Sequence, residues 1–423
     1  MDKRTIRFLK SRFQQYYKTA DISLPDHLPN REWAFILFDD MEEKIMRRHK
    51  SFGLQGEALD YLYGMAPAHV YNSTAYYEYP NAKKMNDKNW LGAELIFDLD
   101  ADHLPNAPRN YADMLENVKK ETLKLIDFLQ DDFGFSEHDM ELVFSGGRGY
   151  HIHIPHPKVI TLDGSARREI INYISGKDLK DNYNNLMKEE KIYGEYGAGS
   201  KVYKGMKKGA SAWFIKEPKY GWGKRIAKYI VNYLQNEVNK ESEADMFRDL
   251  QEMLREDEEE SNLGQTSIKK LIKNASDEKY LKDILNTGRL DSNVRNSGRM
   301  FKFFVEQSIK EYGVDFGASV DEPVTADIKR LIRVPGSLHG GSGMQVKNLA
   351  FSELEDFKPL EDAVVFGEKP VKVNVSKPFT VQLKGKDLRV EEGIQEVPEY
   401  AAVYLMCRGV AEYGHRRDQP NPV

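Results

Sequence analysis

Two aspartates at the end of an apolar run are the residues whose type and spacing most directly suggest catalysis. Asp98 and Asp100 follow residues 95–97, Leu-Ile-Phe, which predict a buried strand. Positions i and i+2 of a strand share a face, so the two carboxylates should lie side by side. A divalent cation such as Mg²⁺ takes carboxylate oxygens as ligands and would relieve their repulsion. The sequence therefore predicts a metal site at this pair, whereas Asp102 is interpreted as a solvated turn residue.

A glycine-rich turn between two predicted strands forms the second candidate site. The turn is Ser145-Gly-Gly-Arg-Gly149, and the alternating run that follows places His151 and His153 on one face. Glycines permit a close backbone approach, and the turn amides, the Ser145 hydroxyl, Arg148 and His151 together suit a polyphosphate. The same pattern also fits an ordinary tight hairpin with a half-exposed histidine, and the turn alone leaves both interpretations open.

A third segment, residues 321–340, combines one more acid with cationic and polar side chains. It contains Asp321, then Arg330 and Arg333, and then Ser337 and His339. Each of these residues alone is typical of a surface or a loop. Together they supply a third carboxylate and the positive charge needed to hold a metal-bound triphosphate.

The three motifs, in this order and with this spacing, resemble the small, catalytic subunit of archaeal DNA primase, in the archaeo-eukaryotic primase superfamily. The matching stretches are residues 97–100, 145–151 and 321–339, supported by 47–52 and 71–80. The resemblance spans roughly residues 30–155 and 295–415. Three ordered motifs are far more specific than any one of them.

This resemblance implies a primase, a nucleotidyltransferase and DNA-directed RNA/DNA polymerase that makes short RNA primers on single-stranded DNA for replication. The implied fold is a mixed α/β (α+β) module with a β-sheet flanked by helices. Asp98, Asp100 and Asp321 would hold two divalent ions, Mg²⁺ or Mn²⁺. The implied partners are a large primase subunit, forming a heterodimer, template DNA and nucleoside triphosphates. The residues implied to bind the nucleotide are Ser145, Gly146, Gly147, Arg148, His151, Arg333 and His339.

The chain departs from the family pattern at two places. Many relatives carry a Cys/His zinc knuckle after the acid motif, but residues 101–140 contain only His103 and His138 and no cysteine. We therefore expect no structural zinc, because such sites need four ligands. Relatives usually have a lysine after the His-Gly pair, where this chain has Gly341 after His339 and Gly340. One phosphate contact is then either lost or supplied elsewhere.

Three sections of the chain should position these motifs. Residues 1–160 are expected to form the N-terminal part of the catalytic domain, residues 161–297 a mostly helical insertion, and residues 298–423 the rest of the catalytic domain with a terminal helix. Apolar spacing predicts the following elements: helices to about Ala20 and at 111–133, 166–174, 224–238, 243–254, 267–284, 299–312 and from Pro398, and strands at 33–38 and within 369–396.

Two basic stretches have more than one interpretation. Residues 47–50, Arg-Arg-His-Lys, either contact template or primer phosphates or form a solvated helix end. The longer stretch from Lys201 to Arg225 interleaves basic and aromatic residues, which suits a nucleic-acid strand but also an ordinary surface.

Composition limits the class of protein. The 423 residues favour two structural units, and a net charge of −5 excludes a uniformly basic nucleic-acid binder. The single cysteine, Cys407, excludes an intrachain disulfide and is typical of a reducing cytoplasm. The sequence contains no apolar run of about 18 residues, so no membrane span is expected, and its first residues predict a helix rather than a secretion signal.

Two rival functions use similar residues. A two-metal nuclease would need the acids but no site for an incoming triphosphate. A non-catalytic nucleic-acid-binding subunit would tolerate loss of the acids, and all three are present. Within the superfamily, a repair or translesion polymerase is the nearest alternative.

The metal hypothesis carries a geometric expectation. Asp321 should lie on a strand beside the one that bears Asp98 and Asp100, so that the three carboxylates share one sheet face. Without metal the three acids should repel one another and raise the pKa of at least one of them. Arg148, His151, Arg333 and His339 should line the same pocket.

Overall fold

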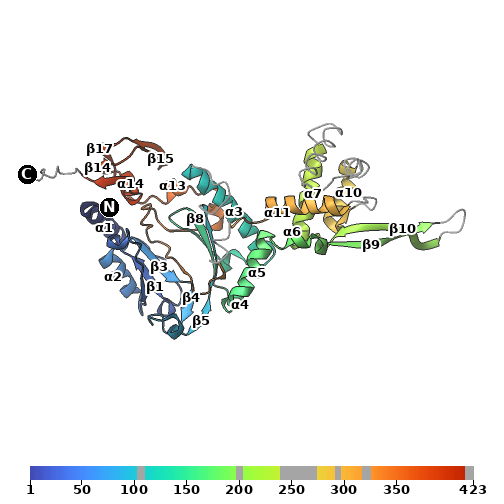
Figure 1. Cartoon of the computed structure of the whole chain (residues 1–423), viewed down its shortest axis with the longest axis horizontal. Coiled ribbons are helices and arrows are strands. Elements are labelled where there is room, and N and C mark those ends of the chain that lie inside the picture. Colours follow the sequence, from blue (N-terminus) through green and yellow to red (C-terminus); the bar gives the residue numbers. More distant parts are fainter. Residues whose placement is uncertain (102–109, 197–202, 239–273, 291–296, 317–324, 415–423) are drawn as a thin grey trace, which may run out of the picture. The chain divides into compact units, whose positions relative to one another are not determined.

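The computed structural model describes residues 1–101, 110–196, 203–238, 274–290, 297–316 and 325–414, which form two compact units. The first unit comprises residues 1–123, 135–171 and 315–423, and the second comprises 124–134 and 172–314. The mixed α/β class predicted from the sequence is confirmed, because helices accompany several antiparallel sheets (Figure 1).

The sheet that carries the acid motif lies in the first unit. Its strand order is β13 (Lys347–Leu349), β7 (Glu141–Phe144), β8 (Gly149–Ile154) and β6 (Leu95–Asp100), with every neighbouring pair antiparallel. The apolar side chains of β6 and β8 are buried, so both strands contribute to the hydrophobic core of the unit. Helix α3 (Tyr111–Asp131) connects β6 to β7.

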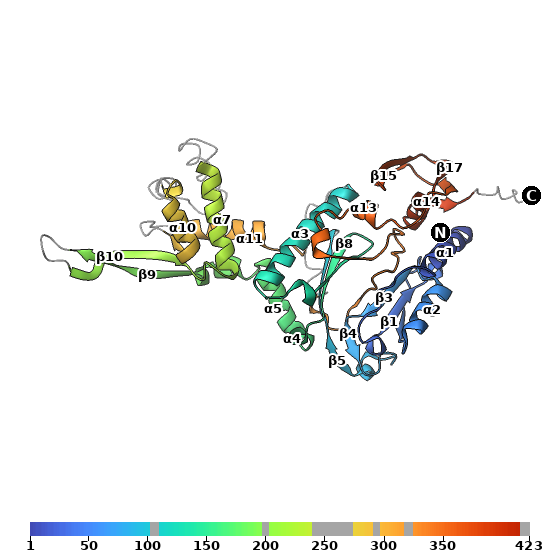
Figure 2. The same cartoon turned by 180° about the vertical axis from the view of Figure 1, so that it is seen from behind.

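A second sheet in the same unit contains the strand of the third motif. Its order is β12 (Leu331–Arg333), β3 (His69–Ser73), β1 (Trp33–Ile36) and β2 (Arg47–Lys50). Helices α1 (Lys3–Tyr17) and α2 (Gln55–Met65) lie beside this sheet (Figure 2). The ring of Tyr61 in α2 packs 4.7 Å from that of Phe35 in β1. Residues 47–50 are thus an edge strand and not a helix end.

The C-terminal part of the first unit forms two small sheets around a buried helix, α14 (Glu399–Cys407). The helix begins after Pro398, as the sequence predicts. The strands are β14 (Pro370–Val375), β15 (Phe379–Leu383), β16 (Lys386–Val390), β17 (Gly393–Pro398) and β18 (Ala411–Tyr413). The remaining elements of the unit are β4 (Ala75–Tyr77), β5 (Trp90–Ala93), α4 (Pro157–Ile160), α5 (Gly164–Ser175, whose last residues fall in the second unit), α13 (Pro359–Asp362), and the 3₁₀ turns η1 (Leu28–Asn30), η2 (Phe38–Asp40), η3 (Met85–Lys88), η5 (Glu137–Asp139) and η7 (Phe351–Glu353).

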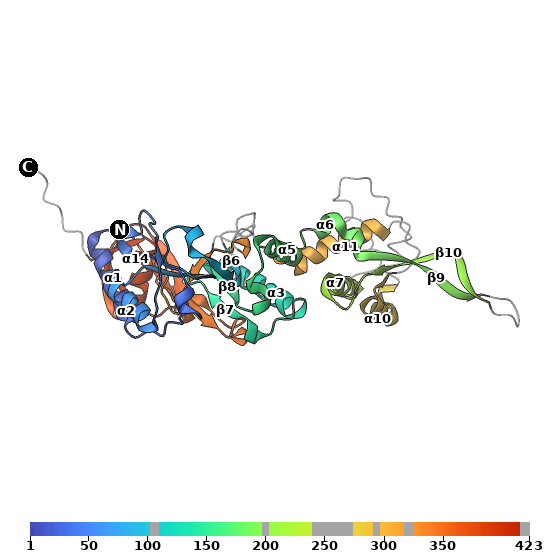
Figure 3. The same ribbon diagram turned by 90° about the horizontal axis from the view of Figure 1, so that it is seen from below.

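The second unit combines helices with a long β-ribbon. Strands β9 (Met187–Tyr196) and β10 (Tyr203–Ile215) pair over their length, and β11 (Arg289–Leu290) joins the edge of β10 (Figure 3). The helices are α6 (Leu179–Asn182) with η6 (Tyr183–Leu186), α7 (Gly221–Val238), α10 (Glu278–Thr287) and α11 (Ser297–Tyr312).

The sequence analysis missed this ribbon. It expected helices between residues 161 and 297, and α5, α7 and α10 correspond to three of them, while residues 243–254 lie outside the described part of the chain. The stretch from Lys201 to Arg225 was interpreted as a nucleic-acid-binding or an ordinary surface, and the β-prone tyrosines and tryptophan within residues 187–215 were not recognised as parts of strands. The proposed limits of the insertion, 161 and 297, also differ from the observed limits of the second unit, which begins at 172 and ends at 314.

No helix that the structure describes is both long enough and apolar enough to cross a membrane.

Candidate active site

The two acids of the first motif lie on β6, opposite the strand that follows the glycine turn. Asp98 pairs with His151 of β8 in the antiparallel register, and Asp100 pairs with Gly149. Directly opposite residues share a sheet face, so Asp98, Asp100 and His151 project to the same side. Gly149 is needed for this pairing, because a Cβ there would stand 1.9 Å from the carbonyl oxygen of Leu99.

Asp98 is held by one imidazole and one guanidinium. His151 Nε2 lies 3.3 Å from Asp98 Oδ1, and Arg330 Nη2 lies 3.8 Å from Asp98 Oδ2. Burial by itself would raise the pKa of Asp98, but His151, Arg330 and Arg333 outweigh it and lower the pKa below its ordinary value. The pKa of Asp98 is therefore lowered and not raised, because neighbouring cations outweigh burial, and the expectation that at least one of the three acids has a raised pKa stays a prediction.

The glycine turn is closed by its serine. The backbone N–H groups of Gly147 and Gly149 both donate to Ser145 Oγ at 3.2 Å. Gly146 has φ of 72°, and a Cβ there would stand 2.8 Å from His339 Cβ. Arg148 at the tip places Nε 3.9 Å from Asp100 Oδ1. The turn thus brings Arg148 next to the acid pair while its glycines admit the third motif.

Arg333 of the third motif is positioned by a histidine from the neighbouring strand. Strand β12 pairs with β3, where Arg333 is opposite Tyr71. Arg333 Nη1 donates to His69 Nδ1 at 2.6 Å, and its guanidinium carbon lies 5.0 Å from the centre of the Tyr71 ring. Burial and then Arg333 lower the pKa of His69 well below its ordinary value, so His69 is neutral and can accept this hydrogen bond.

His339 presents a hydrogen-bond donor to the cavity. The N–H of Gly341 donates to His339 Nδ1 at 3.2 Å, which leaves the ring proton on Nε2. Ser342 Oγ lies 3.2 Å from the same Nδ1 and donates to the carbonyl oxygen of Gly146 at 2.6 Å. Burial, followed by Arg333 and His69, lowers the pKa of His339 well below its ordinary value. His339 is thus a neutral donor that is tied to the glycine turn.

These side chains line one cavity of about 630 Å³, to which both sheets contribute. The sequence-predicted residues in its wall are Asp98, Asp100, Ser145, Gly147, Arg148, His151, Arg333 and His339. Gly146 belongs to the turn behind the wall and contacts Ser342.

Asp321 lies outside the described residues, so its position is not part of this geometry. The nearest strand of its motif, β12, pairs with β3 in the second sheet and not with β6. Among the residues that the structure describes, no group of three or more acids, histidines or cysteines is placed to hold a metal ion.

Several cavity residues were not among the sequence-predicted site residues. Arg330 was noted only as part of the cationic set, and Lys329 and Asp327 precede it. Tyr111 at the start of α3 and Arg408 after α14 were missed entirely. The spacing of Arg330 and Arg333 within one motif was a usable signal. Arg408 offered none, because only folding brings the end of α14 to the cavity.

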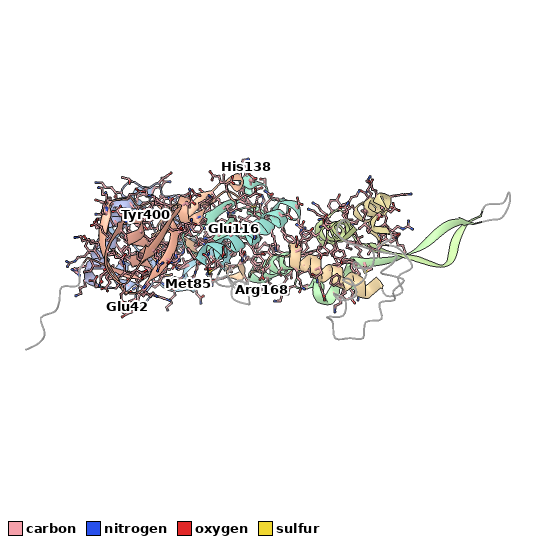
Figure 4. The ribbon with its side chains drawn as sticks, turned by 90° about the horizontal axis from the view of Figure 1, so that it is seen from above. Glu42, Met85, Glu116, His138, Arg168 and Tyr400 are labelled. Atoms are coloured by element: carbon pink, nitrogen blue, oxygen red, sulfur yellow. The ribbon has the colours of Figure 1, made fainter. Side chains whose placement is uncertain are left out.

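The family resemblance places a zinc knuckle between residues 101 and 140, where this chain has two histidines. The structure describes only one of them. His103 lies outside the described residues, and His138 is exposed in η5 (Figure 4). The absence of structural zinc stays a prediction.

The family model and the similar proteins that match this chain all carry the same description. A family model described as DNA primase small subunit matches residues 97–350. The DNA primase small subunit PriS of Methanosarcina acetivorans is 68% identical over 423 residues, which covers 100% of each chain. The proteins of the same name from Methanococcoides burtonii and Methanocella arvoryzae are 52% identical over 414 residues and 42% identical over 418 residues, each covering 98% of this chain and 100% of the relative. The similarity therefore extends over both units.

Proposed function

The chain belongs to the DNA primase small subunit family, and on this basis we propose that the cavity around Asp98 and Asp100 is where it joins nucleotides. Its function is that of the catalytic subunit of a DNA primase, a nucleotidyltransferase of DNA replication. The observation that carries the assignment of the site is the meeting of two acids with His151, Arg148, Arg333 and His339 in one cavity. A nuclease would use the two acids but would need no site for an incoming nucleoside triphosphate.

Asp98 and Asp100 fit a divalent cation, Mg²⁺ or Mn²⁺. Both side chains are partly exposed to the cavity, with 18% and 32% of their side-chain surface accessible. The lowered pKa of Asp98 keeps its carboxylate ionised, as a metal ligand must be. When bound, two such ions supply activation of an attacking 3′-hydroxyl and charge neutralisation at the leaving pyrophosphate. Asp321 remains the proposed third ligand.

The other residues of the cavity act by binding and orienting the nucleotide. Arg148 and Arg333 are proposed to bind phosphate oxygens, which their planar guanidinium groups match. His339 donates an N–H to a phosphate oxygen, and His151 holds Asp98 in place. Ser145 mainly closes the turn, since its oxygen already accepts two backbone N–H groups. Because the attacking group is the 3′-hydroxyl of a nucleotide, the reaction needs positioning and charge stabilisation from the protein but no protein nucleophile.

The partners proposed for this chain are a large primase subunit, a single-stranded DNA template and nucleoside triphosphates. The word "small" in the names of the relatives supports a larger partner in a heterodimer. A cytoplasmic location is supported by replication as the task and by the single, buried Cys407.

The experiment that tests the function is synthesis on unprimed single-stranded DNA, with ribo- or deoxynucleotides, with and without the large subunit. New strands that need no primer support a primase, whereas extension of primed templates alone would support a repair or translesion polymerase. Arg148→Ala should weaken nucleotide binding through loss of a phosphate contact, and His151→Ala through loss of its contact with Asp98, while template binding changes much less in both. Wild-type nucleotide affinity in both variants would contradict the assigned binding set.

A further inference from the structure

A guanidinium from the C-terminal part of the chain enters the wall of the catalytic cavity. Arg408 follows the last residue of α14 and lines the cavity together with Arg148 and Tyr111. Its guanidinium carbon lies 4.6 Å from the ring centre of Tyr111 and 5.3 Å from that of Tyr404. Tyr111 in turn donates its hydroxyl to the carbonyl oxygen of Gly147 in the glycine turn. Two aromatic side chains therefore fix Arg408 beside the turn.

The charge of Arg408 is not balanced by these neighbours. Burial raises the pKa of Tyr111 and of Tyr404, so both phenols are uncharged near neutral pH. Within the described ranges of the chain, no carboxylate forms an ion pair with Arg408, and its buried Nε has no hydrogen-bond partner. Burial alone would lower the pKa of Arg408, but its contacts with Tyr404 and Tyr111 outweigh burial and raise it, so the guanidinium is held as a cation without an acidic partner among the residues that the structure describes. This arrangement favours an anion from outside the protein.

Arg408 also faces a second cavity. This cavity, of about 660 Å³, shares Tyr111, Arg148 and Arg408 with the catalytic one. Its wall adds one lysine, Lys377, and one acid, Asp387. The two arginines therefore line both cavities, and the one lysine and one acid that the second cavity adds leave their positive charge in excess.

We propose that Arg408 and Arg148 form a second phosphate subsite at the junction of the two cavities. The subsite takes the phosphates beyond the α-phosphate of a nucleoside triphosphate, or the inorganic pyrophosphate that nucleotidyl transfer releases. Both ligands offer the same oxygens to the two guanidinium forks. The inference rests on the proposed function, because that reaction brings both ligands to the cavity.

The test compares how the number of phosphates affects binding. The full chain is titrated calorimetrically with a nucleoside mono-, di- and triphosphate and with pyrophosphate, as wild type and as Arg408→Gln. The substitution should weaken triphosphate binding by about 10- to 100-fold, as expected for loss of a charged hydrogen bond. Monophosphate binding should be unchanged. If Arg408→Gln loses affinity for the triphosphate alone, the nucleotide is the ligand of the subsite. If it loses affinity for pyrophosphate alone, the released product is the ligand.

Two further variants separate binding from folding. Arg408→Lys keeps the charge without the fork and should lose less affinity than Arg408→Gln. Arg389→Gln removes an exposed arginine that pairs with Glu391 at 2.9 Å and lines neither cavity, and it should change nothing. An equal loss for all four ligands in Arg408→Gln would mean that Arg408 only supports Tyr111 and the fold. Unchanged binding of all four would also overturn the proposal.

The outcome for the wild type tests the underlying function separately. If the wild-type chain does not prefer the triphosphate over the monophosphate, the proposed nucleotide site itself is wrong. If it has that preference and Arg408→Gln keeps it, only the second subsite is refuted.

Discussion

Arg333 and His69 are 264 residues apart in the sequence, and Arg333 Nη1 lies 2.6 Å from His69 Nδ1. The contact joins the third motif to a histidine that belongs to none of the motifs. It exists because β12 pairs with β3, and because a buried, neutral His69 offers Nδ1 as an acceptor. Arg333 is therefore oriented before any nucleotide binds.

His69→Ala should remove this orientation and leave the charge of Arg333 in place. We expect nucleotide affinity to fall by about 10-fold, close to the loss of one hydrogen bond to a charged group. Arg333→Gln should cost at least as much, and the double variant should lose little more than Arg333→Gln alone. Calorimetric nucleotide titration of the wild type, the two single variants and the double variant gives the coupling energy between His69 and Arg333. Strictly additive losses of affinity would contradict the proposed orienting role of His69.

Asp98→Asn and Asp100→Asn each remove one charged ligand and nearly preserve shape. Primer synthesis should fall more than about 100-fold in either variant, since even supporting residues around a metal change affinity or activity by 10- to 100-fold. Folding stability should change by about 1 kcal/mol. Asp139→Asn, a partly exposed acid of η5 that does not line the cavity, is the matched control. Unchanged turnover at saturating Mg²⁺ or Mn²⁺ would refute the metal assignment.

Asp321→Asn and Asp327→Asn distinguish two candidates for the third acid. Asp327 lines the cavity, but its Oδ1 already accepts the N–H of Lys329 at 2.8 Å. We expect Asp321→Asn to abolish synthesis and Asp327→Asn to reduce it only modestly. The reverse order, measured as initial rates on the same template, would transfer the role to Asp327.

Glu94 should make folding stability depend on acid pH. Its carboxylate forms an ion pair with Arg31, and its Oε2 atom lies 3.2 Å from His153 Nδ1. Burial alone would raise the pKa of Glu94, but His153 and Arg31 lower it from 4.5 to about 2. A lowered folded-state pKa gives stability that is full above pH 4.5 and lost as the pH falls towards 2, at most about 3 kcal/mol.

Glu94→Gln tests this directly. At pH 7 the variant should be less stable than the wild type by roughly 3 kcal/mol, because Arg31 then lacks its counter-charge. In urea unfolding the difference should narrow below pH 4.5. Glu368→Gln, which removes an exposed acid paired with Lys386, should shift stability little at any pH. If the difference in unfolding free energy between the wild type and Glu94→Gln does not change with pH, Glu94 is not the source of the pH dependence.

The purified chain is predicted to contain no structural zinc. The segment that binds zinc in relatives has no cysteine here, and imidazoles and carboxylates alone rarely build such a site. Elemental analysis after preparation in metal-stripped buffer is the measurement. About one zinc per chain that resists mild chelation would contradict the prediction.

Local patterns in the sequence were sufficient for the acid pair and the glycine turn. Period-two alternation places Asp98 and Asp100 on one face whatever the rest of the chain does, and Gly149 is needed where its strand meets the Leu99 carbonyl. Helices α3 and α14 followed from apolar spacing in the same way. These features depend on neighbours within a few residues, which is what a single sequence records.

Tertiary structure decided which partners these residues have. The pairing of β12 with β3 gave Arg333 its contact with His69, and the approach of the chain end after α14 brought Arg408 to Tyr111. The lowered pKa of Asp98 also depends on Arg333 in β12 of another sheet and on Arg330, which immediately precedes that strand. Electrostatic and packing terms of this kind act between segments that are far apart in sequence, so no local pattern specifies them. The chain itself determined the type of chemistry, and the fold determined which cations surround it.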